Sequence, residues 1–419
     1  MNRTERRRLE KINRKQKVAQ PLEREEQIAN AIRELQNGNF SKADRLFGKL
    51  IASNPYDPTA LHFGGIAKYQ LGSYSEALEL LRRTTQAAPN YAEAHNSQGI
   101  VLLEQRDYKA ARQCFNQAIT LKPDYSNAYA NLGSSLRGMS ELSDACTAYQ
   151  TALQQNPQHC EAAYNLAATL LVQNDPACAL EAADCCLAID PYCQNANAYK
   201  AIALSQLGRQ LEWRDLYNFD EMIRKIYFET PSGFDTLEYF NSKLEQDIRN
   251  HPTLTWEPLE RVTRGGAVTK DILLQPTKSI AAFEKVLRSA IDEHRNSLKI
   301  NLKHPFFGRV PKNYRLTLVA SILKAEGRHP PHIHESSWLS GVYYVRVPPV
   351  VNNASDGHAG WLEFGRPDYQ LPKNFCPGIT VRKPEEGAAL LFPSYFFHGT
   401  IPFAGPDERI GIAFDVYPL

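Results

Sequence analysis

Apolar and small residues recur with a period of 34 residues through the first half of the chain. Alanine holds one position of this period, at Ala43, Ala77, Ala111, Ala145 and Ala179. A large apolar residue follows four places later, at Phe47, Leu81, Phe115 and Tyr149. A second small position is held by Gly65, Gly99, Gly133, Ala167 and Ala201, and prolines recur at Pro55, Pro89, Pro123, Pro157 and Pro191. Small residues recur where helices approach closely, so this period predicts a solenoid of stacked helix pairs.

The units resemble tetratricopeptide repeats, with helix pairs expected at 24–57, 58–91, 92–125, 126–159 and 160–193 and a partial or capping unit from 194. One pair cannot bury its apolar face alone, so stacked pairs form one core and a concave surface. The resemblance implies that this surface binds a peptide or protein. Polar residues expected on or near it are Tyr91, His95, Asn96, Tyr125, Asn127, Asn131, Tyr164 and Asn165. For each of them, ordinary solvent-facing helix surface is the alternative.

Beyond the repeats the pattern changes twice. Apolar residues at helical spacing predict one helix over 279–298, packed on a sheet. From Tyr314 onward, strand-like runs alternate with turn signals at 314–323, 339–347, 361–364, 379–382, 388–392 and 410–416. These runs predict a double-sheet jelly roll.

The expected fold class is therefore a multidomain α + β protein, with an N-terminal α-solenoid and a C-terminal double-stranded β-helix with supporting helices. We divide the chain into a basic tail (1–20), the repeats (21–219), a helical connector with sheet-supporting helices (220–305) and the jelly roll (306–419).

Two histidines two residues apart mark the start of the jelly roll. They lie in the stretch RHPPHIHESSWLSGVYYV, and in a strand His332 and His334 would face the same way and could close on one metal ion. Two histidines on a polar strand end with no chemical role are the alternative. A third histidine, His398, ends the apolar stretch GAALLFPSYFFH, and Arg409 follows eleven residues later.

The order H-x-H, His, Arg resembles that of the iron(II) and 2-oxoglutarate dependent oxygenases. The segments HIHESSWLSGVYYV, GWLEFG, LLFPSYFFHGTIPF and ERIGIAFDV look like bacterial members that carry N-terminal tetratricopeptide repeats. The resemblance implies His332, His334 and His398 as metal ligands. It implies Fe(II), 2-oxoglutarate as co-substrate and O2, with ascorbate in support. Arg409 would bind the far carboxylate of 2-oxoglutarate and, by analogy with prolyl hydroxylases, Tyr344 would add a hydroxyl.

The sequence departs from the common pattern of this family at the metal. His334 stands where the usual carboxylate ligand is expected, and an all-histidine set carries no ligand charge. Glu335 and Glu363 are the alternatives for a carboxylate ligand. Gly411 stands where many of these enzymes carry serine.

Several other residues near the motifs are candidates with a second interpretation. A surface salt bridge to Asp407 or Glu408 is the alternative role for Arg409. Three aromatic residues are candidates for the wall of a substrate pocket, with core packing as the alternative for the two tryptophans: Trp338, Tyr343 and Trp361.

The expected function is a dioxygenase that hydroxylates a side chain of a peptide or protein captured by the repeats, with prolyl hydroxylation favoured by family analogy. One alternative is an inactive barrel in a scaffold that binds partner proteins through the repeats. Another is a cupin-like metal enzyme that uses three histidines without 2-oxoglutarate.

Charge adds one more candidate partner. The net charge is only +2, but the first twenty residues contain eight Lys or Arg against two Glu. This tail is a candidate for contact with RNA, the ribosome or an acidic partner, with a solvated extension as the alternative. The sequence has no apolar run of transmembrane length and no hydrophobic secretory segment, so we expect a cytoplasmic protein without membrane contact.

Overall fold

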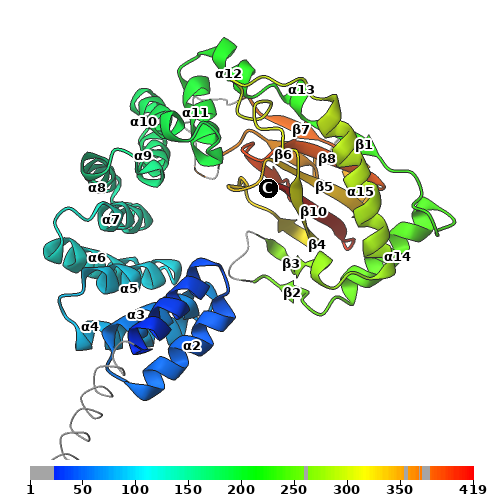
Figure 1. Cartoon of the computed structure of the whole chain (residues 1–419). Helices are drawn as coiled ribbons and strands as arrows, with labels where there is room; N and C mark the ends of the chain where they lie inside the picture. Colours follow the sequence, from blue (N-terminus) through cyan, green and yellow to red (C-terminus); the bar gives the residue numbers. More distant parts are fainter. Residues whose placement is uncertain (1–22, 259–262, 353–356, 368, 370–377) are drawn as a thin grey trace, which may run out of the picture. The chain divides into compact units, whose positions relative to one another are not determined.

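The structure is a computed structural model that describes residues 23–258, 263–352, 357–367, 369 and 378–419. The basic tail and its predicted RNA or ribosome contact lie outside these residues. The chain forms two compact units, Met1–Asn165 and Leu166–Leu419 (Figure 1). Within the described part, no helix is both long enough and apolar enough to cross a membrane.

Helix pairs build the repeats, as the 34-residue period predicts. In the first unit, helical residues 23–36 are followed by α2 (Phe40–Ser53), α3 (Pro58–Gln70), α4 (Tyr74–Ala87), α5 (Ala92–Glu104), α6 (Tyr108–Leu121), α7 (Ser126–Gly138) and α8 (Leu142–Gln155). The series continues with α9 (Cys160–Val172), α10 (Pro176–Ile189), α11 (Gln194–Gln206) and α12 (Gln210–Leu216). The predicted starts at 58, 92, 126 and 160 are the first residues of α3, α5, α7 and α9.

The periodic prolines follow the ends of the second helices. α2, α4, α6, α8 and α10 each end two residues before a proline, and the residue between has left the helical conformation, with ψ between 79° and 96°. A proline ring clashes with a helical residue before it, so it favours this extended conformation. The prolines thus set where each repeat turns into the next.

The periodic glycines leave room for the large residues of the next helix. A Cβ atom added at Gly99 would lie 2.5 Å from Cε1 of Phe115, and one added at Gly133 would lie 2.7 Å from Cε1 of Tyr149. Phe115 and Tyr149 are fully buried. Helices α5 and α6, and α7 and α8, therefore approach more closely than a larger residue at either glycine would permit.

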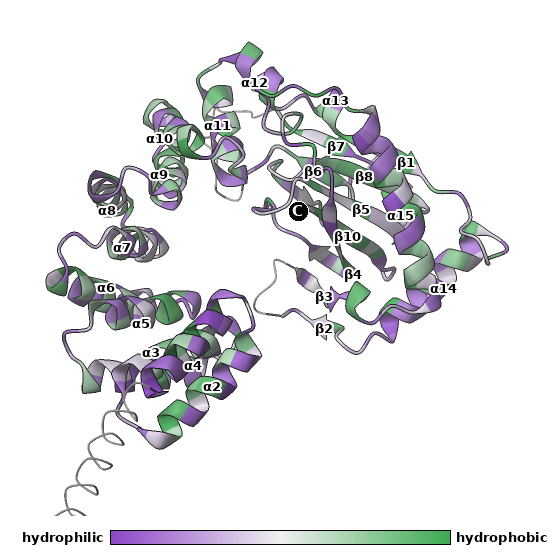
Figure 2. Ribbon diagram, in the orientation of Figure 1, coloured by the Kyte–Doolittle hydropathy of each residue, from purple (hydrophilic) through white to green (hydrophobic). Residues whose placement is uncertain are grey.

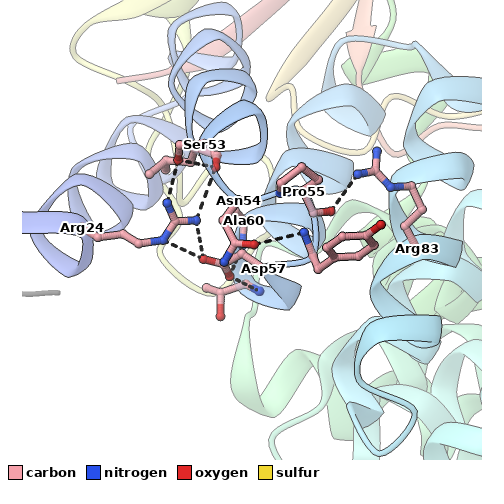
Figure 3. Close-up of polar contacts among 10 residues, drawn as sticks. Arg24, Ser53, Asn54, Pro55, Asp57, Ala60 and Arg83 are labelled. Atoms are coloured by element: carbon pink, nitrogen blue, oxygen red, sulfur yellow. Dashed lines mark hydrogen bonds and ion pairs between the residues drawn. The ribbon is translucent and has the colours of Figure 1, made fainter. Parts of the chain in front are cut away.

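Polar contacts join the helix of residues 23–36 to the end of α2 and the start of α3. Arg24 donates from Nε and Nη2 to a carboxylate oxygen of Asp57, at 3.1 and 2.6 Å, and from Nη1 to Ser53 (Figure 3). The other carboxylate oxygen of Asp57 accepts from the backbone N–H groups of Thr59 and Ala60 at the start of α3. Asp57 therefore caps α3 and also binds the helix of residues 23–36 through Arg24.

The second unit contains two antiparallel sheets. The strands are β1 (Arg224–Tyr227), β2 (Thr255–Trp256), β3 (Arg264–Asp271), β4 (Tyr314–Arg328), β5 (Leu339–Arg346), β6 (Leu362–Phe364), β7 (Thr380–Arg382), β8 (Ala388–Pro393), β9 (His398–Thr400) and β10 (Arg409–Pro418). The large sheet has the order β1-β8-β5-β10-β4-β3-β2, and the small sheet has the order β7-β6-β9. The predicted jelly roll is confirmed, and each predicted strand run overlaps an observed strand.

Helices cover the outer face of the large sheet. The remaining helices are α13 (Phe219–Met222), η1 (Ile272–Leu274), α14 (Leu237–Arg249), α15 (Lys278–Ser297) and η2 (Pro349–Asn352). α14 and α15 lie beside the sheet (Figure 1), and the Tyr343 ring on β5 packs 4.7 Å from Phe283 on α15. Figure 2 shows hydrophobic residues along β10 and both hydrophobic and hydrophilic residues on α15. The predicted sheet-covering helix at 279–298 is confirmed.

The connector supplies strands as well as helices, which the sequence analysis did not expect. β1 pairs with β8 through Arg224–Leu391 to Tyr227–Ala388, and β3 pairs with β4. β1 has only four residues, too few to show a clear alternation. The proposed segment bounds at 20, 219 and 305 stay a prediction.

Two tyrosines join the end of α12 to the turn between β8 and β9. Tyr217 donates its hydroxyl to the backbone oxygen of Tyr395 at 2.8 Å, and Tyr395 donates to the backbone oxygen of Leu216 at 2.7 Å. Both rings are about 1% exposed. This turn leads directly into His398.

Candidate metal centre

Three histidines from two distant segments meet inside the jelly roll. His332 and His334 follow β4, whereas His398 is the first residue of β9. Two backbone hydrogen bonds, each 3.0 Å long, join His332 to His398. One ring nitrogen from each of the three lies within 4.8 Å of the others, close enough to hold one metal ion. The structure thus brings together the three predicted ligands.

Each of the three rings is held through Nδ1. His332 contacts the backbone oxygen of Pro330 at 2.8 Å, and His398 contacts the backbone oxygen of Phe396 at 2.9 Å. His334 contacts a carboxylate oxygen of Asp415 at 2.8 Å. An oxygen of this kind only accepts, so Nδ1 carries the proton and the lone pair of the neutral ring lies on Nε2. Histidine ligands in metal sites are commonly oriented in this way. This donor set fits a divalent transition metal.

Burial keeps His332 and His398 in the form that binds metals. Desolvation, followed by the nearby His334, lowers the pKa of His332 to about 4. Desolvation, followed by His332 and His334, lowers the pKa of His398 well below its usual value. A neighbouring histidine that the sequence analysis did not use, His329, has its pKa lowered to about 3, first by burial. At neutral pH these rings are uncharged and able to coordinate.

Asp415 is a component of the site that the sequence analysis missed. It lies on β10, and its two carboxylate oxygens are 2.7 and 2.8 Å from Nδ1 of His334. Ser340 and Ser337 donate to the same carboxylate at 2.6 and 3.1 Å. Burial alone would raise the pKa of Asp415, but His334 and the two serines together hold it below the usual value. The carboxylate therefore stays ionised beside the histidines.

A small cavity of about 80 Å³ adjoins the three histidines. Arg409 lines it and is 4% exposed. Its Nη1 donates to Thr400 at 2.8 Å, and its guanidinium lies 5.0 Å from the centre of the Tyr344 ring. Among the described residues, Arg409 Nε and the Tyr344 hydroxyl have no hydrogen-bond partner, and no carboxylate lines the cavity. The cavity is therefore suited to an anionic ligand.

The alternative role of Arg409 was a surface salt bridge to Asp407 or Glu408, and for Glu408 the structure shows a different partner. That carboxylate pairs with Arg249 at 2.6 Å. Burial, partly offset by Arg409, raises the pKa of the Tyr344 hydroxyl, so it is a protonated donor at neutral pH. Gly411 also lines the cavity, opposite Tyr344 in the strand register.

A wider groove of about 380 Å³ also adjoins two of the histidines. His332 and His334 line both the groove and the small cavity. Glu335, Asp415 and Tyr417 are also part of its lining. A metal held by the histidines would therefore adjoin both spaces, the small cavity and the wider groove.

Among the described residues, neither alternative carboxylate belongs to the group of ligand atoms that the three histidines form. Glu363 on β6 is paired opposite Gly399. Its neighbours on the strand, Leu362 and Phe364, are buried, so the Glu363 side chain points to the other face of the strand. Its carboxylate binds Arg366 at 2.6 Å. Glu335 is exposed and lines the groove.

The three aromatic candidates for a substrate pocket line neither the cavity nor the groove. Trp338 stacks on Phe306 with ring centres 4.8 Å apart and donates to its backbone oxygen. Tyr343 points to the helix-covered face, where its hydroxyl donates to Asn241 of α14 at 2.6 Å. Trp361 donates to the backbone oxygen of Val351. Within the described residues these side chains pack in the protein instead.

Polar residues on the first helices of the repeats bind one another between successive pairs. Asn131 donates to Asn96 at 2.9 Å. His62 contacts Ser97 and Tyr91 through its two ring nitrogens, each at 2.9 Å. These contacts link repeat to repeat, and a peptide-binding role for the surface stays a prediction.

Fold and site together define the class of this protein: a jelly roll with a candidate three-histidine metal centre, preceded by tetratricopeptide repeats. Comparison with known families gives the same two parts. Residues 319–415 match the family described as "Putative 2OG-Fe(II) oxygenase". Residues 64–126 and 131–192 match the family described as "Tetratricopeptide repeat". The expected combination of the two families is confirmed.

Similar solved structures are tetratricopeptide-repeat proteins. MamA from Desulfovibrio magneticus RS-1 is 24% identical, covers 40% of this chain and 95% of its own, and has a TM-score of 0.37. The pilF structure from Pseudomonas aeruginosa is 22% identical, covers 46% and 86%, and has a TM-score of 0.42. YrrB, described as a TPR protein with an unusual peptide-binding site, is 22% identical, covers 41% and 88%, and has a TM-score of 0.35. No curated protein matches the chain.

Proposed function

We propose that the protein is an Fe(II)- and 2-oxoglutarate-dependent dioxygenase that hydroxylates a side chain of a peptide or protein held by the repeats. The observation that carries this proposal is the pairing of two features. Three histidine rings present Nε2 lone pairs within one small space, and a buried arginine lines the cavity beside them. The match of residues 319–415 to an oxygenase family supports the same reaction class.

The residues of the site have separate tasks in this proposal. His332, His334 and His398 would hold Fe(II), which supplies the redox chemistry with O2 when bound. Three protein ligands leave positions on the metal for 2-oxoglutarate and oxygen. Arg409 would bind the far carboxylate of 2-oxoglutarate by charge-assisted hydrogen bonds. The protonated Tyr344 hydroxyl would donate to the same carboxylate.

The substrate would approach through the groove. The cavity of about 80 Å³ is small and enclosed, which suits the co-substrate, whereas the groove of about 380 Å³ can admit a side chain. The repeats support a peptide or protein as the substrate, because a stacked helical array offers an extended surface. Family analogy makes proline the first residue to test.

The test is turnover by the full-length protein. With Fe(II), ascorbate, O2 and 2-oxoglutarate, we expect succinate to form, and to form faster with proteins captured by the repeats. Mass spectrometry of those proteins should show the mass of one added oxygen. The His398→Ala variant should form no succinate, and Arg346→Met should behave as the wild type, because Arg346 is an exposed cation paired with Glu245.

Two results would overturn the proposal. If 2-oxoglutarate is neither bound nor consumed, the jelly roll acts as a scaffold beside the repeats. If oxidation proceeds without 2-oxoglutarate and Arg409→Met leaves it unchanged, the protein is a three-histidine enzyme of another class.

A further inference from the structure

Asp415 occupies a fixed place at the centre of the large sheet. Its strand β10 lies between β4 and β5, and Asp415 is opposite Thr317 on one side and Ser340 on the other. Residues alternate between the two faces of a strand, so Asp415 shares the inner face with Arg409. Its side chain is 15% exposed. The carboxylate is thus placed by the pairing of three strands and not by a loop.

A chain of hydroxyl groups holds the carboxylate. Ser340 donates to one oxygen of Asp415 at 2.6 Å, and Ser337 reaches the same oxygen at 3.1 Å. Ser394 lies 2.8 Å from Ser340 and 2.9 Å from Ser337. Each hydroxyl has a single proton, so a Ser340 that donates to the carboxylate accepts from Ser394. Ser337 has one proton for two acceptors, the carboxylate and Ser394, so the network directs at least the proton of Ser340 to the negative charge.

His334 differs from the other two histidines in what its Nδ1 meets. His332 and His398 donate to neutral backbone oxygens, whereas His334 donates to an ionised carboxylate. His334 is also the residue at the place where the resemblance leads us to expect a charged ligand. The negative charge is therefore present, one hydrogen bond further from the metal position.

We propose that Asp415 is a positioning residue of the metal centre, one that supplies through His334 the negative charge that an all-histidine ligand set lacks. This inference rests on the proposed metal-binding function. The carboxylate fixes His334 with its lone pair on Nε2 and strengthens that nitrogen as a donor to a divalent cation. The serines keep the carboxylate in place when the metal binds or leaves.

The charge and the hydrogen bond can be separated by substitution. Asp415→Asn has nearly the same shape and can still accept from Nδ1 of His334, but it carries no charge. The matched control is Glu363→Gln. It removes a carboxylate from the small sheet, and that carboxylate binds Arg366 and not a histidine. A merely structural role of Asp415 would alter thermal unfolding of the metal-free protein without a selective effect on metal affinity.

The experiment is an anaerobic titration of metal-free full-length protein with Co(II) and Fe(II), followed by calorimetry and by the visible absorption of bound Co(II). Loss of such an outer partner commonly weakens metal binding about 10- to 100-fold. We expect a loss in that range for Asp415→Asn, with a shifted Co(II) spectrum, and wild-type affinity for Glu363→Gln.

Each outcome has a defined meaning. Equal affinity of the wild type and Asp415→Asn would overturn this inference and leave the proposed function standing. No metal binding by the wild type would overturn both. If Asp415→Asn does not fold, Ser340→Ala is the second variant, because it loosens the carboxylate and retains its charge. A several-fold loss of affinity would then support the inference, and an unchanged affinity would overturn it.

Discussion

Replacing Arg409 by methionine should separate stability from function. Methionine has a comparable length and no charge, so it can fill the same space. Arg409 is 4% exposed, and no carboxylate is found among the described residues that line its cavity. The protein therefore carries a buried cation whose natural counter-charge, in our proposal, belongs to the co-substrate.

The magnitude follows from three contributions. Desolvation of a buried ion costs several kcal/mol. The hydrogen bond from Nη1 to Thr400 returns about 1.5–3 kcal/mol, and the contact with the Tyr344 ring returns about 2 kcal/mol. We expect the metal-free variant to be as stable as the wild type or more stable by about 1–2 kcal/mol, from the difference between these contributions. For a unit of this size that is a rise of roughly 2–8 °C in melting temperature.

The co-substrate should stabilise the wild type but not the Arg409→Met variant. At a concentration of about 100 times its dissociation constant, a ligand stabilises the wild type by about 2.7 kcal/mol. Arg409→Met should gain almost nothing. The assay is thermal unfolding of the full-length protein with Mn(II), with and without 2-oxoglutarate, and Arg346→Met is the control that should respond as the wild type does. A variant that is less stable than the wild type and still responds to 2-oxoglutarate would refute the reasoning.

Three further predictions concern other parts of the chain. Glu335→Gln should keep wild-type metal affinity in calorimetry, since this residue is exposed; a large loss would make it a ligand in place of His334. His294→Leu should reduce the loss of stability in acid. Burial, followed by Arg224, lowers the pKa of His294 to about 4, so only the unfolded chain gains a proton there as the pH falls from about 6.5. Unfolding by urea at pH 7.5 and 5 checks this, and an equal loss in both proteins would contradict it. Phe115→Ala should cost about 3–5 kcal/mol in urea unfolding, because the ring fills a space in the repeat core; a cost below 1 kcal/mol would contradict the packing described for it.

The repeats were predictable because their information is local. Each proline and each glycine of the period acts on a neighbour within one or two helices, so the sequence alone placed the first residues of α3, α5, α7 and α9. The strand runs of the jelly roll were recognisable for a similar reason, since alternation within each run is visible without its partner.

Contacts set by strand register were not predictable. Asp415 meets His334 across 81 residues, and they come together because β10 pairs with both β4 and β5, the strands on either side of His334 in the chain. The face of the strand to which a side chain points was equally hard to predict. Alternation separates Tyr343 from Tyr344, but nothing in the sequence says which of the two points inward. The short strand β1 was missed because its pairing with β8, and not its own pattern, defines it.

The bonds between Tyr217 and the turn before His398 limit how such a protein can be assembled from parts. The last helices of the array lie in the same compact unit as the jelly roll, and Tyr217 helps to position the turn that carries a candidate ligand. A gene fusion that joined a new array to residue 220 would discard that tyrosine and loosen the turn. A replacement array should therefore be joined upstream, before about Leu166, so that α10, α11 and α12 stay with the jelly roll.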